Sequence, residues 1–152
     1  IDSRAVKKAA AHVADALAGG ATLVTGGKAT TGDFFEATVL TGVAADALLT
    51  REETFGPVAG IVKFDTEAQA IDYANRGQAG LAAYLYTRDA DRMTRVSEAL
   101  EYGMVGINTG LISTEVGPFG GWRESGLGRE GSRHGLEEYL EMKFLVRQVA
   151  SA

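Results

Sequence analysis

The sequence contains no cysteine, and this absence excludes disulfide bonds, thiolate metal sites and a cysteine nucleophile within its 152 residues. Histidine is nearly as scarce. The two histidines, His12 and His134, lie too far apart in the sequence to show the spacing of a metal-ligand pair. We therefore expect packed or solvated histidines and no bound metal.

Positive charge and long apolar runs are also in short supply. The formal net charge is −5, and the basic residues are scattered rather than gathered into a stripe. A nucleic acid would require a basic face to neutralise its phosphates, so that class of partner is not expected. No apolar run approaches the ~20 residues that a membrane-spanning helix needs, and the first residues have no signal-peptide pattern. We expect a cytoplasmic protein with no membrane partner.

The composition that remains is that of a folded globular protein. Hydrophobic residues make up 45% and charged residues 23%, a balance that argues against disorder. The length suffices for one domain. Because the chain begins with Ile1 rather than Met, we expect it to belong to a longer polypeptide.

Helix and strand signals alternate along the first two thirds of the chain. The first helix is predicted to be capped by Asp2 or Ser3 and to end at Gly19–Gly20. Its apolar residues form one stripe: Val6, Ala10, Val13 and Leu17. Capping residues Thr66 and Asp89 start two further helices. Strands are predicted at residues 22–25, 34–40, 58–64, 81–86 and 104–108. This order predicts an α/β fold in which helices flank a parallel sheet.

The composition changes after Asn108. Residues 109–131 are rich in glycine and carry few periodic apolar residues. An irregular stretch of this length inside a domain more often has a function than not. A short helix is predicted at 132–139. Residues Lys143–Val149 are then predicted to form a strand without a partner in the chain, which would pair with another sheet in the same or another subunit.

Residues Gly126–Gly131 spell G-x-G-x-x-G, the fingerprint of dinucleotide-binding loops. That fingerprint binds a pyrophosphate when a strand leads directly into it and a helix begins beneath it. Here a long glycine-rich loop precedes the motif, so we do not assign it to a dinucleotide.

Residues 52–57 form a different constellation, with two adjacent carboxylates, an aromatic residue and a Gly-Pro pair. Composition alone favours a charged turn. The functional alternative is that a carboxylate accepts ribose hydroxyls while the ring of Phe55 packs on a planar heterocycle.

The segment Glu53–Val58 resembles the E-x-F-G-P-V signature of the aldehyde dehydrogenase family. Further blocks match this family in the same order and spacing, namely Gly80–Ala83, Gly106–Gly110, Pro118–Gly121, Glu124–Gly131 and Gly135–Tyr139. The resemblance covers essentially the whole chain and aligns it with the last third of a full-length enzyme. It implies that residues 1–139 belong to the catalytic domain and residues 140–152 to an oligomerisation segment.

The resemblance implies an NAD- or NADP-dependent oxidation of an aldehyde. In this family a Cys thiolate adds to the aldehyde, hydride passes to the nicotinamide, and water hydrolyses the thioester with a Glu as base. Both catalytic residues would lie before Ile1, in the remainder of the polypeptide, so the isolated chain is expected to be inactive. Glu53 would hold the nicotinamide ribose, and Phe55 would pack against the nicotinamide ring.

Four more positions match residues with roles in the family. Phe119 matches an aromatic at the mouth of the substrate pocket, the alternative being packing within the loop. Glu130 matches an acid proposed to relay protons, the alternative being a structural ion pair or a helix-start carboxylate. Arg129 and Glu141 match subunit contacts of a homodimer or homotetramer, although either could be an ordinary surface charge.

Within the family, residues 106–113 and 128–131 are most similar to the succinate-semialdehyde dehydrogenase branch. There Ser113 would hydrogen-bond the distal carboxylate of the substrate, the alternative being a serine that caps a turn. Ala37, where the family often has proline, and the bulky Trp122 depart from the pattern. The implied reaction converts succinate semialdehyde to succinate. Two alternatives stay open: another semialdehyde or neutral aldehyde as substrate, and a non-catalytic assembly module.

Overall fold

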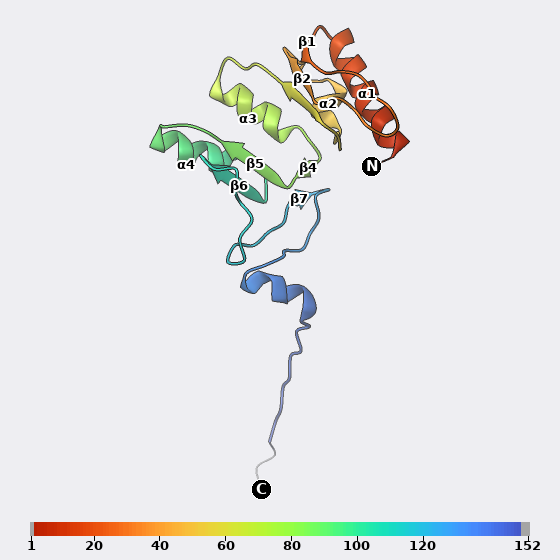
Figure 1. Cartoon of the computed structure of the whole chain (residues 1–152). Helices are drawn as coiled ribbons and strands as arrows, with labels where there is room; N and C mark the ends of the chain where they lie inside the picture. The colour runs from red at the N-terminus through yellow and green to blue at the C-terminus, as the bar shows by residue number, and fades with distance from the viewer. Residues whose placement is uncertain (1, 150–152) are drawn as a thin grey trace. The chain divides into compact units, whose positions relative to one another are not determined.

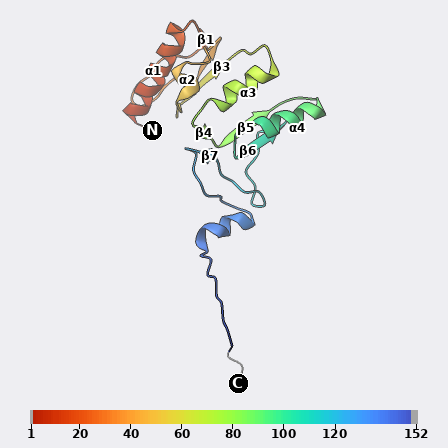
Figure 2. The same cartoon turned by 180° about the vertical axis from the view of Figure 1, so that it is seen from behind.

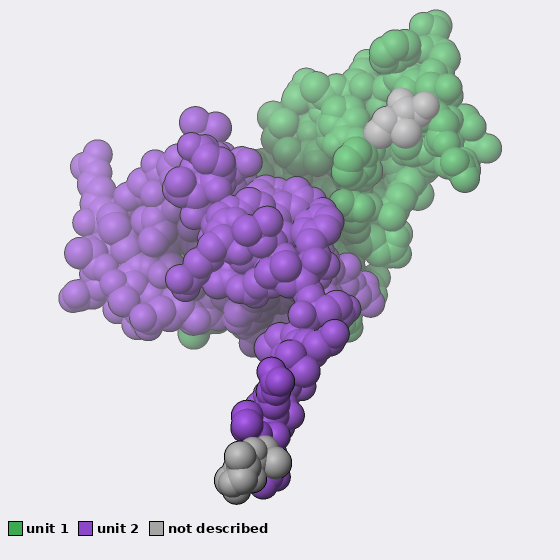
Figure 3. All heavy atoms as spheres, turned by 90° about the horizontal axis from the view of Figure 1, so that it is seen from below, with its two compact units in different colours: residues 1–78 green, residues 79–152 purple. Residues whose placement is uncertain are grey.

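The computed structural model describes residues 2–149 and divides the chain into two compact units, residues 1–78 and 79–152 (Figure 3). Each unit contains its own hydrogen-bonded strands. The boundary expected at residues 139 and 140 concerns the catalytic and oligomerisation parts of a complete enzyme, and it stays a prediction.

Unit 1 is a three-stranded sheet with helices (Figure 1). Its elements are α1 (Ser3–Ala18), β1 (Thr22–Thr25), β2 (Thr38–Thr41), α2 (Leu48–Arg51), β3 (Val58–Ile61) and α3 (Glu67–Asn75). Strand β2 is central, antiparallel to β1 and parallel to β3. The short helix α2 was not predicted.

The opening helix confirms its predicted cap. The carboxylate of Asp2 accepts hydrogen bonds from the backbone N–H groups of Arg4 (2.9 Å) and Ala5 (3.1 Å), which satisfies donors that a helix start leaves free. At the other end Gly20 takes the left-handed conformation, with φ of 94°, that glycine adopts without strain.

The buried face of α1 differs from the predicted stripe. Its buried residues are Ala9, His12, Val13 and Ala16, whereas Ala10 and Leu17 are exposed. Val13 and Ala16 of this helix join Ala21, Leu40, Val43 and Ala47 in the core of unit 1.

The strand predicted at residues 34–40 begins later, at Thr38. The preceding residues fold back instead: Thr30 N–H donates to Phe34 O and Glu36 N–H donates to Lys28 O, both at 3.0 Å. A β-bridge between Ala29 and Phe35 completes this small hairpin. The aromatic pair therefore finds strand-like partners locally, which its β-propensity could not specify.

Unit 2 contains a parallel pair and a short antiparallel pair of strands. Its elements are β4 (Ala79–Gly80), β5 (Ala82–Leu85), α4 (Ala90–Ala99), β6 (Met104–Ile107), β7 (Trp122–Arg123) and the 3₁₀ helix η1 (Arg133–Tyr139). Helix α4 packs on the parallel pair β5–β6. The strand expected at 81–86 forms as β5, one residue shorter at each end. The short strand β4 before it pairs with β7, and neither of these two strands was predicted.

The α/β class is confirmed, since β2–β3 and β5–β6 are parallel and helices accompany them. The antiparallel pairs β1–β2 and β4–β7 were not expected. The predicted caps Thr66 and Asp89 are also confirmed, because each side chain accepts a hydrogen bond from the helix it precedes.

Residues 140–149 extend away from η1 and are all exposed (Figures 1 and 2). The strand predicted at Lys143–Val149 is not formed in the single chain, because no strand among residues 2–149 pairs with this segment. The end of the predicted oligomerisation segment, residues 150–152, lies outside the described residues.

Leu40 gives a test of the unit 1 core. It is fully buried in β2, whereas Leu23, its register partner in β1, is 38% exposed. We expect Leu40→Ala to lower the free energy of unfolding by about 2–5 kcal/mol, because it leaves a cavity. Leu23→Ala should cost clearly less. Urea denaturation of both variants checks this, and a larger loss for Leu23→Ala would contradict the assigned core.

Candidate functional site

The predicted site residues fall into two sets. Glu53 and Phe55 belong to unit 1, and Ser113, Phe119, Arg129 and Glu130 belong to unit 2. Each set is built by different local structure.

The loop that carries Glu53 and Phe55 runs from the end of α2 to the start of β3. At its first residue, Glu52 N–H donates to Leu48 O (2.9 Å) and ends the helix. At its last residue, Pro57 O accepts a hydrogen bond from Thr38 N–H (2.8 Å) in β2. The loop is thus attached at both ends to ordered elements.

The two predicted cofactor residues present their functional groups to the outside of unit 1. Phe55 is 70% exposed, and the carboxylate of Glu53 belongs to an exposed residue. An exposed carboxylate close to an exposed aromatic ring fits a ligand with ribose hydroxyls and a flat heterocycle. The residues present are therefore compatible with the nicotinamide half of NAD or NADP.

One participant in this loop was missed by the sequence analysis. His12 of α1 is buried, and its Nδ1 lies 2.5 Å from the hydroxyl of Thr54. In the sequence, Thr54 stands between the two predicted cofactor residues, Glu53 and Phe55. The Nε2 of His12 lies 3.5 Å from a carboxylate oxygen of Glu52. The available signal was a polar residue next to Val13 on the apolar face of a helix.

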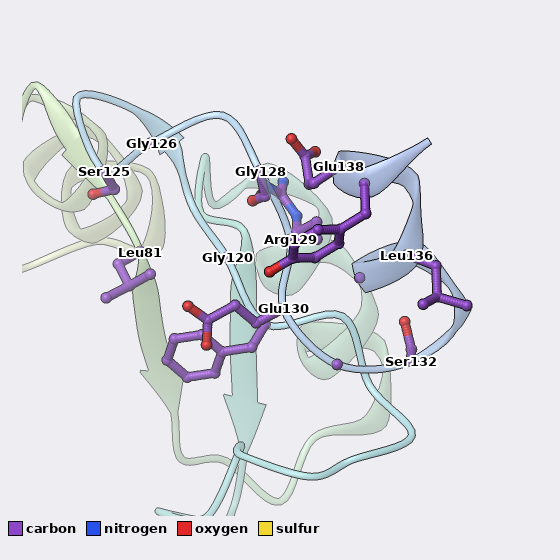
Figure 4. Close-up of a pocket in the computed structure, with 14 residues that line it drawn as sticks. Leu81, Gly120, Ser125, Gly126, Gly128, Arg129, Glu130, Ser132, Leu136 and Glu138 are labelled. Carbon is purple, nitrogen blue, oxygen red and sulfur yellow. The ribbon is translucent and has the colours of Figure 1, made fainter. Parts of the chain in front are cut away.

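Unit 2 contains a hollow of about 750 Å³ formed mainly by the glycine-rich segment and η1 (Figure 4). It is lined by Leu81, Phe119, Gly120, Ser125, Gly126, Gly128, Arg129, Glu130, Gly131, Ser132, Gly135, Leu136, Glu138 and Tyr139. In the close-up, Leu81 and Ser125 lie on one side of the hollow, and Ser132 and Leu136 lie on the other. Three of the predicted site residues therefore share this hollow.

Phe119 and Glu130 are joined by backbone hydrogen bonds in both directions. Phe119 N–H donates to Glu130 O (2.8 Å), and Glu130 N–H donates to Phe119 O (2.7 Å). Such a reciprocal pair is the repeating unit of an antiparallel ladder, and here it joins the middle of the glycine-rich stretch to its end. The carboxylate of Glu130 forms no ion pair with another residue in the range 2–149, so the ion-pair alternative finds no support within the chain.

The side chain of Arg129 forms hydrogen bonds within unit 2. Its Nη1 donates to the carbonyl oxygens of Gly121 and Gly128, each at 2.9 Å. Glycine at position 120 makes room for this side chain, because an added Cβ there would lie 2.6 Å from Arg129 Cδ. Its predicted subunit contact, and that of the exposed Glu141, stay predictions.

Ser113 does not line the hollow and is exposed in the loop that follows β6. Within the described part of the chain its hydroxyl has no hydrogen-bond partner, so it caps no turn there. The start of this loop is held by Asn108, which has a φ of 55° and whose side-chain amide bonds the backbone of Thr87 at 2.8 and 2.9 Å. The Ser113 hydroxyl is available to a ligand.

The G-x-G-x-x-G segment lacks the geometry of a dinucleotide loop, as expected. Strand β7 ends at Arg123, before the motif, and a 3₁₀ helix rather than an α-helix follows it from Arg133. Among residues 2–149 no group of three ligand-type side chains could hold a metal ion, and no helix there is long and apolar enough to cross a membrane.

Comparison with protein families identifies the chain. Residues 1–145 match the aldehyde dehydrogenase family. The chain belongs to this family. Both the E-x-F-G-P-V loop of unit 1 and the glycine-rich hollow of unit 2 lie within the matched range.

Characterised aldehyde dehydrogenases share more than half of the residues of this chain. The glutarate-semialdehyde dehydrogenase of Pseudomonas putida is 55% identical over 98% of this chain and 31% of its own length. The NADP(+) succinate-semialdehyde dehydrogenase GabD of Escherichia coli is 56% identical over 95% of this chain and 30% of its own length. An NADP-dependent enzyme from E. coli of known structure has a TM-score of 0.90 and 57% identity, covering 94% of this chain and 30% of that chain.

The chain therefore spans about 30% of the length of the aldehyde dehydrogenases that it matches. It contains no cysteine, so the thiol that the resemblance implies for the family chemistry is not among these residues.

Arg129 provides a test of the hollow. Arg129→Ala removes two hydrogen bonds to loop carbonyls, and we expect the amides of Phe119 and Glu130 to exchange about tenfold faster. Hydrogen exchange measured by NMR checks this. Arg133→Ala, at an exposed position in η1, is the matched control and should leave both amides unchanged. Equal effects of the two variants would show that Arg129 does not hold the loop.

Proposed function

We propose that this chain is part of an NAD(P)-dependent dehydrogenase that oxidises succinate semialdehyde to succinate in the cytoplasm. The observation that supports this most is its 55–56% identity with enzymes named for succinate and glutarate semialdehydes. Both compounds are aldehydes that carry a carboxylate at the far end of the molecule. A residue that binds the distal carboxylate is therefore the feature to test.

In this proposal the loop of unit 1 binds the nicotinamide half of the cofactor. NAD or NADP, when bound, accepts hydride from the substrate. Glu53 accepts hydrogen bonds from the ribose hydroxyls, and the 70% exposed ring of Phe55 packs on the nicotinamide. The thiolate that adds to the aldehyde, and the Glu that serves as base, come from parts of the enzyme outside this chain.

Unit 2 contributes the substrate side. The free hydroxyl of Ser113 donates a hydrogen bond to the distal carboxylate, and Phe119 shapes the mouth of the pocket. Glu130, held beside Phe119 by the backbone ladder, accepts and passes on a proton from the base. A hydroxyl donor suits an anionic tail better than an aromatic ring would.

Glutarate semialdehyde is the second candidate substrate, because the Pseudomonas putida relative is named for it. It is one methylene longer than succinate semialdehyde. A pocket distinguishes such homologues by only about 1–3 kcal/mol, so the two substrates should be compared by kcat/KM.

The role of Ser113 can be tested in the full-length enzyme. Ser113→Ala should raise KM for succinate semialdehyde about tenfold or more, since a hydrogen bond to a charged group is lost. KM for butanal, which has no carboxylate, should change little. Steady-state kinetics with both aldehydes measures the difference. Ser113→Thr keeps the hydroxyl and should restore much of the affinity.

Two results would count against this reading. Equal changes of KM for the charged and the neutral aldehyde would show that Ser113 does not bind the distal carboxylate. No turnover of either semialdehyde by the wild-type full-length enzyme, with NAD or NADP, would overturn the proposed function and favour a non-catalytic module.

The C-terminal segment supports a proposal about assembly. Six large apolar side chains between residues 140 and 149 are at least 70% exposed: Leu140, Met142, Phe144, Leu145, Val146 and Val149. Exposed apolar segments of this kind mark protein interfaces, and a free strand edge requires a partner. We infer that Lys143–Val149 joins the sheet of a neighbouring subunit, with Arg129 and Glu141 near the contact, in a homodimer or homotetramer.

Deletion of residues 143–152 from the full-length enzyme should therefore convert a dimer or tetramer into smaller species. The physical reason is that the sheet edge of the neighbouring subunit loses the strand that would pair with it. Sedimentation velocity at several protein concentrations measures the change. An assembly that is identical with and without the segment would contradict this role.

A further inference from the structure

Helix α1 carries a polar side chain in the middle of its buried face. His12 is 2% exposed and, with Leu40, is one of the two largest fully buried side chains in the described residues. Its neighbours on this face are Ala9, Val13 and Ala16. An imidazole in apolar surroundings is unfavourable unless its ring nitrogens have partners. Those partners indicate what the histidine does.

Both ring nitrogens of His12 face the loop at residues 52–57. Nδ1 lies 2.5 Å from Thr54 Oγ1, and Nε2 lies 3.5 Å from Glu52 Oε2. The hydroxyl of Thr54 is hydrogen-bonded to Nδ1, and the carboxylate of Glu52 lies near Nε2, so each ring nitrogen has a polar neighbour. One buried side chain thus contacts the residues on each side of Glu53, and the second of them directly precedes Phe55.

Few other interactions hold the middle of this loop. Within residues 2–149, the backbone N–H groups of residues 53–55 donate to no other residue. Glu52 also pairs with Lys8 at 3.6 Å, but both side chains are about half exposed, and such pairs contribute little in water. Gly56 N–H donates to Thr54 O (2.8 Å), a bond within the loop itself. The hydrogen bond between His12 and Thr54 is therefore the buried polar contact that joins the middle of this stretch to α1 in the described part of the chain.

We propose that His12 is a positioning residue for the nicotinamide cofactor. Through Thr54 and Glu52 it fixes the backbone that presents Glu53 and Phe55, so the loop is ordered before the cofactor arrives. Without this anchor, part of the binding free energy would be spent on ordering the loop. The inference rests on the proposed function, because it requires that Glu53 and Phe55 bind the cofactor.

Thr54→Val in the full-length enzyme is the primary test. Valine keeps the shape of threonine and removes the hydroxyl, so the hydrogen bond to His12 is lost with little change in volume. We expect the Kd for NAD or NADP, whichever binds the wild type more tightly, to rise about fivefold to tenfold. KM for the aldehyde should stay unchanged. Thr54→Ser restores the hydroxyl and should restore the Kd.

Variants of His12 test the same contact from the helix. His12→Asn places an amide near the position of Nδ1 and should weaken cofactor binding less than His12→Leu. His134→Leu is the matched control, because this histidine lies in η1 and is bonded to Glu137 at 3.0 Å. It should leave the cofactor Kd unchanged. If His12→Leu does not fold, the Thr54→Val and Thr54→Ser pair still decides the question.

Two further variants separate this inference from the proposed function. If Phe55→Ala and Glu53→Gln weaken cofactor binding while Thr54→Val does not, His12 is not a positioning residue, and the proposal that this loop binds the cofactor is retained. If neither Phe55→Ala nor Glu53→Gln changes the Kd, the loop is not the nicotinamide site, and both proposals about it fail. Hydrogen exchange of residues 53–55 without cofactor should be faster in Thr54→Val, and unchanged exchange would also overturn the anchor.

Discussion

The packing of α1 on the sheet of unit 1 is the contact on which the rest of that unit depends. Val13 and Ala16 of the helix share the core cluster with Leu40, which is completely buried in the central strand. On the same buried face, His12 lies at hydrogen-bond distance from Thr54. The same face of α1 therefore contributes to the hydrophobic core and contacts the E-x-F-G-P-V loop. Displacing the helix from the sheet would also break its hydrogen bond to the loop.

The glycine-rich segment of unit 2 is ordered by a different physical means. The glycine-rich stretch has few apolar side chains to bury, so backbone ladders and one guanidinium hold it instead. Phe119 and Glu130 exchange two hydrogen bonds, and Arg129 bridges the carbonyls of Gly121 and Gly128. The glycines permit this closeness, since a side chain at position 120 would collide with Arg129. An irregular segment thereby becomes a defined wall of a hollow.

Local chemistry could be predicted from the sequence, and pairing over distance could not. The caps at Asp2, Thr66 and Asp89 were found because a cap and its helix are adjacent in the chain. The early start predicted for β2 was wrong because residues 34–36 found a nearer partner. Strand β7 was missed because two residues carry no periodicity. The predicted site residues could be named from the family resemblance, but the anchor of their loop could not.

The sequence by itself determined the family, the α/β class and the absence of the catalytic thiol, since these depend on residue identity, order and spacing. Only the tertiary structure decided that His12 meets Thr54, 42 positions away, and that Phe119 pairs with Glu130. It also decided that Arg129 turns inward to loop carbonyls. Such contacts depend on how the chain closes on itself, and a histidine on an apolar helix face has many possible partners until packing selects one.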